Sequence, residues 1–314
     1  MIGYLKHINP RLFLILFMFA SANYGFGQQQ PHYAQYLYNM QVINPAFVGS
    51  KSDLNVTLLR RQQWVNVEGA PETTTFSANT RVNSGFGFGT TVISDKIGLL
   101  DNTSVNGDLS YTLPVSEFGR LSFGVKTGLS FFNNNLASGT TVDNEVYASR
   151  TGTYGNLGFG FLYTNQHFFA AFSVPNIFAT PVFTLQQNFE TVTDLENGNY
   201  FFSCGAFINL SKFSDIVFRP STLIKYTPNL PLSVDINANF IYNKTYEFGL
   251  SYRYTNSISA MFALNINEKF RIGYAYENQL NAIGNNFNTH EIILRLDLKL
   301  NRNKRWLYDD CCYF

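Results

Sequence analysis

The strongest constraint on the fold is an alternation of apolar and polar residues with a period of two. The segment from Tyr246 to Thr255 sets bulky apolar side chains against small or charged ones, the apolar row being Tyr246, Phe248, Leu250, Tyr252 and Tyr254. Successive side chains of a strand point to opposite faces, whereas a helix repeats every ~3.6 residues. Because this alternation recurs through most of the chain, it predicts an all-β fold.

The alternating segments number about 14, an even count that is typical of bacterial outer-membrane barrels. They lie near 53–61, 73–82, 85–94, 103–113, 120–132, 153–164, 166–174, 199–211, 215–227, 231–243, 245–255, 257–267, 269–278 and 288–300. Their polar rows contain mainly Gly, Ser and Asn, whereas the wet face of a soluble sandwich is rich in Lys, Glu and Thr. Aromatic residues such as Tyr111, Tyr242, Tyr254 and Tyr276 stand at segment ends, as in the aromatic girdles of membrane barrels. We therefore predict a single transmembrane antiparallel β-barrel of residues 53–300, with a secreted β-sandwich as the alternative.

The composition agrees with a barrel that binds no nucleic acid. Aromatic residues make up 17% of the chain and charged residues only 14%, against about 25% charged residues in soluble domains. The net charge is +1, which leaves no excess of positive charge for a polyanion.

Residues 1–27 have the order of a secretory signal. The basic residues Lys6 and Arg11 precede an apolar run from Leu12 to Ala20, and small residues follow up to Gly27. The apolar run is shorter than the ~20 residues that a spanning helix needs. We predict cleavage after Gly27 and insertion into the outer membrane, with an uncleaved anchor as the alternative.

The connections between the expected strands differ in length. Short turns such as Asn243-Lys244 and Asn267-Glu268 alternate with long polar inserts at 133–152, 176–198 and 279–287. Outer-membrane barrels keep their periplasmic turns short, so the long inserts are predicted to be extracellular. The tail 301–314 is either a disordered extension or a docking peptide.

No catalytic or cofactor motif stands out, and we expect neither an enzyme nor a bound metal or cofactor. The four histidines, His7, His32, His167 and His290, have no metal-ligand spacing. The glycines in 85–89 and 155–160 alternate with apolar residues, so we interpret them as relieving crowding in curved strands rather than as a phosphate loop. The thiols of Cys204, Cys311 and Cys312 are interpreted as inert, with a disulfide from Cys204 to the tail as the alternative.

Charges of both signs occupy the inward rows of the later segments. They are Asp235, Glu247, Arg253, Arg271, Glu277, Glu291, Arg295 and Asp297. A selective pore usually shows a bias of one sign. The mixture favours ion pairs that stiffen the barrel, and the alternative is a path for a small solute or a fatty acid.

The stretch after the signal contains unusual residues that strand formation does not explain. The motifs are Gln35-Tyr36-x-x-Asn39, Asn44-Pro45-Ala46-Phe47-x-Gly49, Arg61-Gln62-Gln63-Trp64 and Gly69-Ala70-Pro71-x-Thr73. In order and spacing they resemble the start of the PorP/SprF family of Bacteroidetes outer-membrane proteins, and the stretch from His290 to Leu294 resembles the family's final strand. The resemblance spans about Gln28 to Leu300.

This resemblance implies an outer-membrane barrel of the type IX secretion and gliding machinery. Its expected partners are a large secreted adhesin, whose export or surface attachment it assists, or other components of the secretion system, including a periplasmic one, within the outer-membrane lipid. A barrel that transports a small solute or a lipid-like ligand is the alternative.

The family-signature residues have two alternative roles. As a plug or lid, the segment 28–52 would be anchored by Tyr33, Tyr36, Tyr38 and Phe47, with turns at Asn39 and Asn44 and a backbone fixed by Pro45. As a docking patch, Trp64 with Arg60 and Arg61 would face a secreted partner, since Trp and Arg are common at binding hot spots. The candidate site residues are Gln35, Tyr36, Asn39, Asn44, Pro45, Phe47, Gly49, Arg61, Trp64, Gly69 and Pro71.

Overall fold

The computed structural model describes residues 33–51, 53–82, 85–135, 149–177, 198–210, 215–228, 230–254, 256–280 and 287–300. All of them belong to one compact unit that begins at residue 31. The predicted signal, the tail, Cys311 and Cys312, and the central parts of the three long inserts lie outside these residues.

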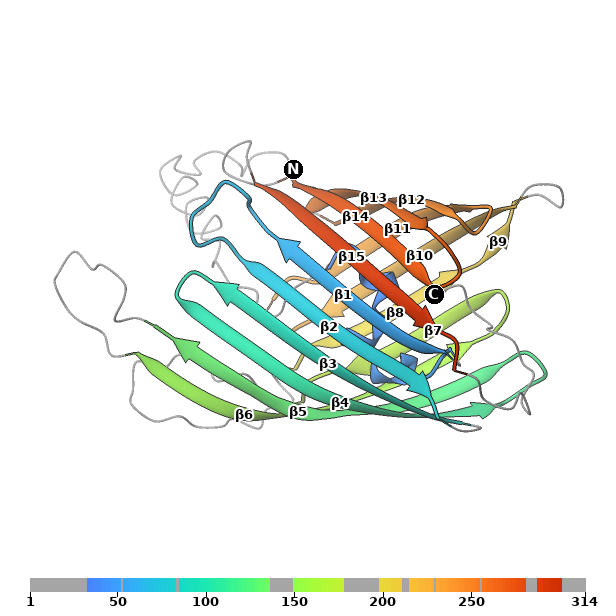
Figure 1. Ribbon diagram of the computed structural model, residues 1–314, viewed down its shortest axis with the longest axis horizontal. Helices are drawn as coiled ribbons and strands as arrows, with labels where there is room; N and C mark the ends of the chain where they lie inside the picture. The colour runs from blue at the N-terminus through green and yellow to red at the C-terminus, as the bar shows by residue number, and fades with distance from the viewer. Residues whose placement is uncertain are drawn as a thin grey trace, which may run out of the picture. The chain divides into compact units, whose positions relative to one another are not determined.

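A closed antiparallel barrel forms the body of the molecule (Figure 1). Its strands are β1 (Leu54–Gln62), β2 (Glu72–Arg81), β3 (Phe86–Ile97), β4 (Leu100–Pro114), β5 (Arg120–Asn134), β6 (Arg150–Thr164), β7 (Phe168–Val174), β8 (Tyr200–Ala206), β9 (Ile208–Asn209), β10 (Ile216–Tyr226), β11 (Ser233–Tyr242), β12 (Tyr246–Arg253), β13 (Ser257–Asn265), β14 (Phe270–Gln279) and β15 (Asn288–Leu298). Strands that follow one another pair with each other, except that β8 and β9 both pair with β10, and β1 pairs with β15 to close the ring.

The strands β8 and β9 occupy one position in the wall, because both pair with β10. Phe207 separates them and turns its side chain inward, where it is buried near Phe169. The barrel therefore has 14 wall positions among the described residues. Each expected segment overlaps one of these positions, which confirms the predicted β-barrel and its strand count.

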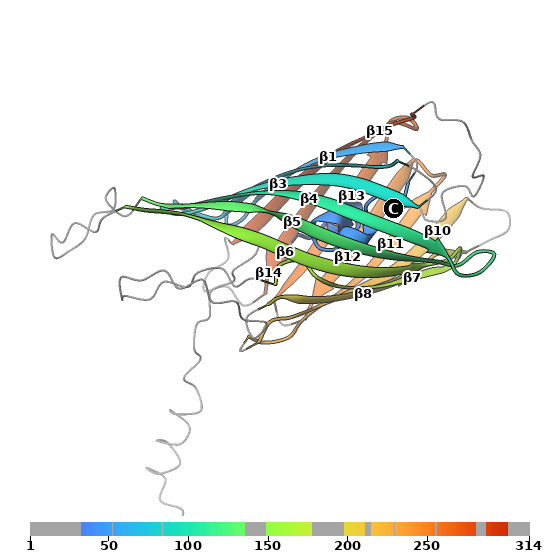
Figure 2. The same cartoon turned by 90° about the horizontal axis from the view of Figure 1, so that it is seen from below.

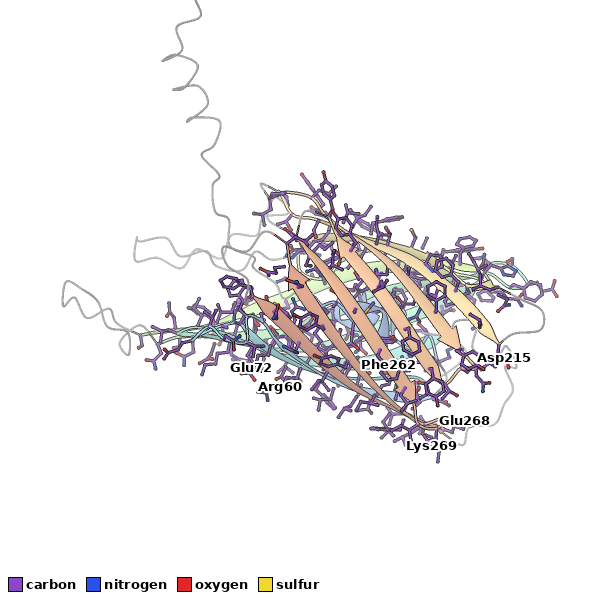
Figure 3. The ribbon with its side chains drawn as sticks, turned by 90° about the horizontal axis from the view of Figure 1, so that it is seen from above. Arg60, Glu72, Asp215, Phe262, Glu268 and Lys269 are labelled. Atoms are coloured by element: carbon purple, nitrogen blue, oxygen red, sulfur yellow. The ribbon has the colours of Figure 1, made fainter. Side chains whose placement is uncertain are left out.

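The outer face of the barrel is apolar and the inner face is polar. Burial in β12 alternates strictly, so Phe248 and Leu250 are exposed outside while Glu247 and Ser251 are buried inside. Phe262 has the same outward position on β13 (Figure 3). Large apolar side chains are exposed on strands all around the wall, and this is the surface that a lipid bilayer requires. Among the described residues, no helix is long and apolar enough to cross a membrane.

The two ends of the barrel differ. The end where β11 meets β12 has tight turns: Asn243 and Lys244 have φ values of 50° and 53°, and Thr245 N–H donates to Tyr242 O at 3.0 Å. The turns 115–119, 165–167 and 266–269 lie at this same end, which we call the short-turn end. Strands β4, β5 and β6 are each 15 residues long and extend toward the opposite end (Figure 2).

The segment 33–50 lies inside the barrel, where it forms three single-turn helices (Figure 1). These are η1 (Tyr36–Tyr38), η2 (Met40–Val42) and η3 (Pro45–Phe47). The segment and inward side chains of the wall share one hydrophobic cluster. We call this segment the inner segment. It begins near the end opposite the short turns and leaves the barrel at the short-turn end, where β1 starts.

Candidate functional site

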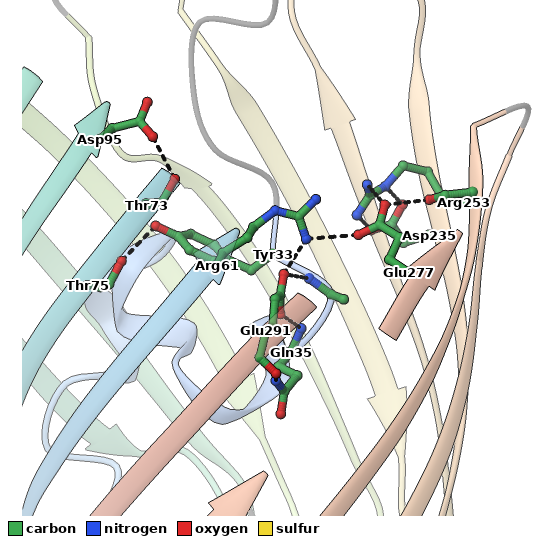
Figure 4. A network of polar contacts seen from close by, with 12 residues as sticks. Tyr33, Gln35, Arg61, Thr73, Thr75, Asp95, Asp235, Arg253, Glu277 and Glu291 are labelled. Carbon is green, nitrogen blue, oxygen red and sulfur yellow. Dashed lines mark hydrogen bonds and ion pairs between the residues drawn. The ribbon is translucent and has the colours of Figure 1, made fainter. Parts of the chain in front are cut away.

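The amino end of the inner segment is bound by β15. The Glu291 carboxylate accepts the backbone N–H groups of Ala34 at 2.7 Å and Gln35 at 2.9 Å (Figure 4). The Gln35 side chain in turn donates a hydrogen bond from Nε2 to the Glu291 backbone oxygen at 3.2 Å. Two backbone donors that would otherwise be buried without partners are thus satisfied by one charged acceptor, which is the strong kind of hydrogen bond.

Three tyrosines fix the first part of the inner segment against different strands. The Tyr33 and Thr75 hydroxyls are 2.8 Å apart, and Asn237 Nδ2 donates to the Tyr36 hydroxyl at 2.7 Å. The Tyr38 ring lies beside two guanidinium groups, with Arg219 at 5.6 Å and Arg271 at 5.1 Å from its centroid. Cation–π contacts of this kind are stronger when they are desolvated, as here.

The middle of the inner segment binds β2, β3 and β4. Ser77 Oγ donates to Asn39 Oδ1 at 2.8 Å. The Gln41 amide donates to the Thr90 backbone oxygen at 3.1 Å and to the Asp108 carboxylate at 3.0 Å. The predicted position of Asn39 at a turn is correct, since it lies between η1 and η2.

The motif from Asn44 to Gly49 crosses to the opposite wall. Asn44 Oδ1 accepts the Ala46 N–H at 2.9 Å and caps η3, while its Nδ2 donates to the backbone oxygens of Phe161 and Phe172 at 3.1 and 3.2 Å. Pro45 occupies the first turn, where its missing N–H costs nothing. The Phe47 ring packs edge-on against Phe169 at 6.2 Å.

Inward-facing glycines of the wall lie directly against the inner segment. A Cβ at Gly87 would lie 2.6 Å from the Val48 backbone oxygen, and one at Gly273 would lie 2.7 Å from Gln35 Oε1. At Gly124 a Cβ would overlap the Ala46 backbone, and at Gly160 it would overlap the Asn44 amide. The interpretation of the glycines in 85–89 and 155–160 as relieving crowding in curved strands therefore misses the main contact of Gly87 and Gly160, which make room for the inner segment.

All eight charges predicted to face the lumen do so, and each forms an ion pair. Arg61 of β1 joins the set by bridging Glu277 at 2.8 Å and Glu291 (Figure 4). The remaining pairs are Arg253 with Asp235 at 2.8 Å and with Glu277 at 2.9 Å, Arg271 with Glu247 at 3.7 Å, and Arg295 with Asp297 at 3.2 Å.

Two further ion pairs in the lumen were missed by the sequence reasoning. Arg219 is fully buried and pairs with Glu247, and Lys126 Nζ lies 2.7 Å from the Asp108 carboxylate. The signal was present, because Arg219 and Lys126 stand at inward positions of the alternating pattern.

The predicted docking patch of Trp64, Arg60 and Arg61 is wrong as a single surface. Neighbouring residues of a strand face opposite ways, so Arg60 lies outside, where it pairs with Glu72 (Figure 3), while Arg61 is buried in the lumen. Trp64 lies beyond β1 in the connection 63–71, with its ring 5.8 Å from that of Phe287.

The other two signature residues shape the same connection. Gly69 has a φ of 74° and accepts the Gly98 N–H at 2.9 Å, and Pro71 accepts the Gln63 N–H at 2.9 Å. Positive φ is readily adopted by glycine, which explains its use at position 69. Within the described ranges, no cluster of His, Cys, Asp or Glu could hold a metal ion.

A closed barrel with an apolar outer face and a polar lumen defines a transmembrane β-barrel of the outer membrane. The chain matches the family model described as type IX secretion system membrane protein PorP/SprF over residues 25–296, and it belongs to that family.

Solved outer-membrane proteins have a similar architecture at low identity. The Acinetobacter baumannii outer membrane protein Omp33 is 8% identical, with a TM-score of 0.47 and coverage of 80% of this chain and 100% of that one. The Ralstonia pickettii toluene transporter TbuX is 11% identical, with a TM-score of 0.47 and coverage of 82% and 92%. No curated protein sequence matches the chain at a significant level.

Proposed function

We propose that this chain is a non-enzymatic, internally plugged barrel of the type IX secretion and gliding machinery. In this role it assists the export or surface attachment of a large secreted adhesin, or it links the machinery to a periplasmic partner. The single observation that carries the proposal is the inner segment, whose residues fill the lumen and bind strands all around the wall.

The plug role is supported by the number and kind of bonds that hold the inner segment. Ser110 and Ser173 donate to the backbone oxygens of Val48 and Ile43 at 2.5 and 2.7 Å. Arg81 donates to the backbone oxygens of Gly49 and Ser50 at 2.7 and 2.8 Å. Buried bonds to carbonyl groups are costly to break without replacement, so the segment is a fixed part of the barrel and blocks a water-filled path.

A small-solute transporter would need the inner segment to move during each cycle. The Glu291 contacts, the cation–π contacts of Tyr38 and the contacts at Gly87 and Gly124 would all have to break together. A protein-binding scaffold does not require the inner segment to move, because its partners bind at the ends of the barrel. The arrangement therefore favours the scaffold over the transporter.

The test combines electrical and cellular measurements. The purified protein is expected to show no steady conductance in a planar lipid bilayer, whereas a variant lacking residues 33–50 should conduct if it folds. In the native bacterium, deletion of the gene should abolish surface display of an adhesin, and reintroduction of the gene should restore it. Normal display together with reduced uptake of a small solute would instead establish the transporter.

A further inference from the structure

The strand β6 has an unpaired edge in its amino-terminal half. All 15 residues of β6 pair with β5, but only residues 159–164 pair with β7, which ends at Val174. The next bond on the β7 side is from Ile177 N–H to Leu157 O at 2.7 Å. Residues 150–156 therefore have no strand partner on the β7 side among the described residues.

The Leu157 bond shows which backbone groups point to this edge. The N–H and C=O groups of successive strand residues point alternately to the two neighbouring strands, so those of Thr151, Thr153 and Gly155 point in the same direction as Leu157 O. One N–H and one C=O from each of these three residues line the edge. We call these groups the β6 edge.

The β6 edge lies beyond the apolar band of the barrel. The outward side chains Leu157 and Phe161 are large, apolar and exposed, whereas the outward residues of the edge are two threonines and a glycine. Open sheet edges do not occur in the hydrocarbon of a membrane, because their backbone groups would lack partners. The edge therefore lies in water at the end opposite the short turns (Figure 2), and outer-membrane barrels direct that end to the cell exterior.

The β6 edge has none of the usual protection against pairing with another chain. Natural sheet edges are protected by Lys, by Pro, by bulges or by short strands. Thr151, Thr153 and Gly155 are neither charged nor proline, and β6 pairs with β5 along its full length without a bulge. Backbone groups in this arrangement are suited to the addition of an extended peptide strand.

The chain's own continuation after β7 does not fit the edge. Continued in register from the bond between Ile177 and Leu157, the sequence would place Pro181 opposite Thr153. Proline has no N–H to donate and interrupts a strand ladder. A strand from elsewhere is therefore needed to satisfy the edge.

A second copy of the chain in the same membrane does not fit the edge either. Strands of outer-membrane barrels are tilted by about 35–45°. In two copies related by an axis along the membrane normal, facing β6 strands would cross at about twice this angle. Strands that cross so steeply cannot form a ladder of hydrogen bonds.

We propose that the β6 edge binds an extended segment of the secreted adhesin, which adds a strand beside β6. Main-chain hydrogen bonds to Thr151, Thr153 and Gly155 supply the affinity, and these small side chains leave room for those of the added strand. The identification of the partner as the adhesin rests on the proposed function, whereas the strand-binding edge itself does not.

The probe is a fluorescein-labelled peptide Lys-Thr-Val-Thr-Val-Thr-Lys, measured by fluorescence anisotropy with the full chain in detergent micelles. Valine and threonine favour strands. The matched control peptide has the same sequence with N-methyl groups on its five central residues, which removes their backbone donors. We expect binding of the unmethylated peptide only.

Thr153→Pro removes one donor of the edge and leaves the pairing with β5 intact, because this N–H points away from β5. Proline is tolerated in edge strands at such positions. We expect a loss of about tenfold in affinity, the scale of one backbone hydrogen bond. Gly152→Ala is the control, since it keeps every donor of the edge and its new Cβ meets nothing within 4 Å.

Equal binding of the two peptides would overturn the edge, and this result does not depend on the folding of a variant. Equal affinity of the parent and of Thr153→Pro, with the heat-modifiable shift of a folded barrel, would also overturn it. Much tighter binding by a variant without residues 179–197 would assign the edge to the chain's own segment. A parent dimer that Thr153→Pro dissociates would assign it to a second copy.

In cells, Thr153→Pro should reduce adhesin display and Gly152→Ala should not. Peptide binding by the parent, together with normal display by cells that carry Thr153→Pro, would leave the edge standing and refute the adhesin as its partner. Failure of the proposed function would differ, because display would then be normal in cells without the gene.

Discussion

The carboxylate of Glu291 accepts the backbone N–H of Ala34 at 2.7 Å, although the two residues are 257 positions apart. Glu291 also pairs with Arg61, and Arg61 and Glu291 face each other across the pair β1 and β15 that closes the ring. The contact that holds the inner segment and the contact that closes the barrel therefore share one side chain. A change at Glu291 is therefore expected to affect both the inner segment and the closure of the barrel.

Glu291→Gln should weaken both contacts at once. The neutral amide keeps the shape of the side chain but leaves Arg61 with Glu277 alone, and breaking a buried ion pair typically costs about 3–5 kcal/mol. We expect the folded band on unboiled gels to disappear at a lower temperature than in the parent. Glu268→Gln removes a carboxylate from a fully exposed turn and serves as the control. Equal melting of all three proteins would refute this expectation.

Gly124→Ala should displace the inner segment, because the new methyl group has no space beside the Ala46 backbone. Overpacking of this kind costs about 1–3 kcal/mol. The expected result is faster cleavage of the segment 33–50 by chymotrypsin, with the rest of the barrel intact. Gly152→Ala is the matched control, since a Cβ at Gly152 meets nothing within 4 Å. Similar cleavage rates for the two variants would mean that Gly124 does not set the fit.

The amino-acid sequence was sufficient to predict the strands of the barrel wall, but it was not sufficient to predict the contacts inside the lumen. Alternation fixes the face of every side chain, so the strands, the apolar outer surface and the inward charges all followed from it. Which charges pair with each other depends on the strand register, and the alternation of residues gives no information about the register. Gly87 and Gly160 make room for the inner segment, which is distant from them in the sequence. No local sequence pattern therefore predicts this contact.

Arg61 shows that residues of one sequence motif need not lie on the same surface. It was grouped with Arg60 and Trp64 because the three are close in sequence, although adjacent strand residues face opposite ways. The alternation of side chains along β1 was enough to predict that Arg60 and Arg61 lie on opposite faces of the wall. The place of Trp64 was not predictable in this way, because it depends on where β1 ends and on a φ of 47°.

Phe262→Arg should strongly destabilise the barrel in a bilayer. Phe262 lies on the outer face in the middle of β13, where a charge near the bilayer centre costs about 2–4 kcal/mol. The measurement is the free energy of unfolding in lipid vesicles with urea or guanidinium. Phe262→Leu keeps an apolar side chain and should lose much less stability. An equally small loss for both variants would place Phe262 outside the hydrocarbon region.

Glu268 should titrate below the ordinary range of a glutamate. Lys299 donates to its carboxylate at 2.5 Å, and this hydrogen bond, with the nearby charge, lowers the pKa of Glu268. A lowered pKa means that the contact stabilises the fold above the ordinary value of about 4.3 and is lost as the pH falls through the lower folded value. Carboxyl NMR should therefore show a lower midpoint in the parent than in Lys299→Gln. Equal midpoints would contradict the ion pair in solution.

The variant Trp64→Ala should distinguish a packing role of Trp64 from a role in docking a partner. The ring of Trp64 meets Phe287 edge-on, a contact worth about 0.5–1.5 kcal/mol, so the variant should lose little stability and keep the heat-modifiable barrel. Trp64→Gly is the companion variant, because glycine also relieves the positive φ at this position. On the proposed function, if the connection 63–71 only packs, cells with either variant should display the adhesin as cells with the parent protein do. Loss of display with a folded barrel in both variants would assign the indole a role in binding the secreted partner, whereas loss of the barrel itself would show that Trp64 is needed for folding.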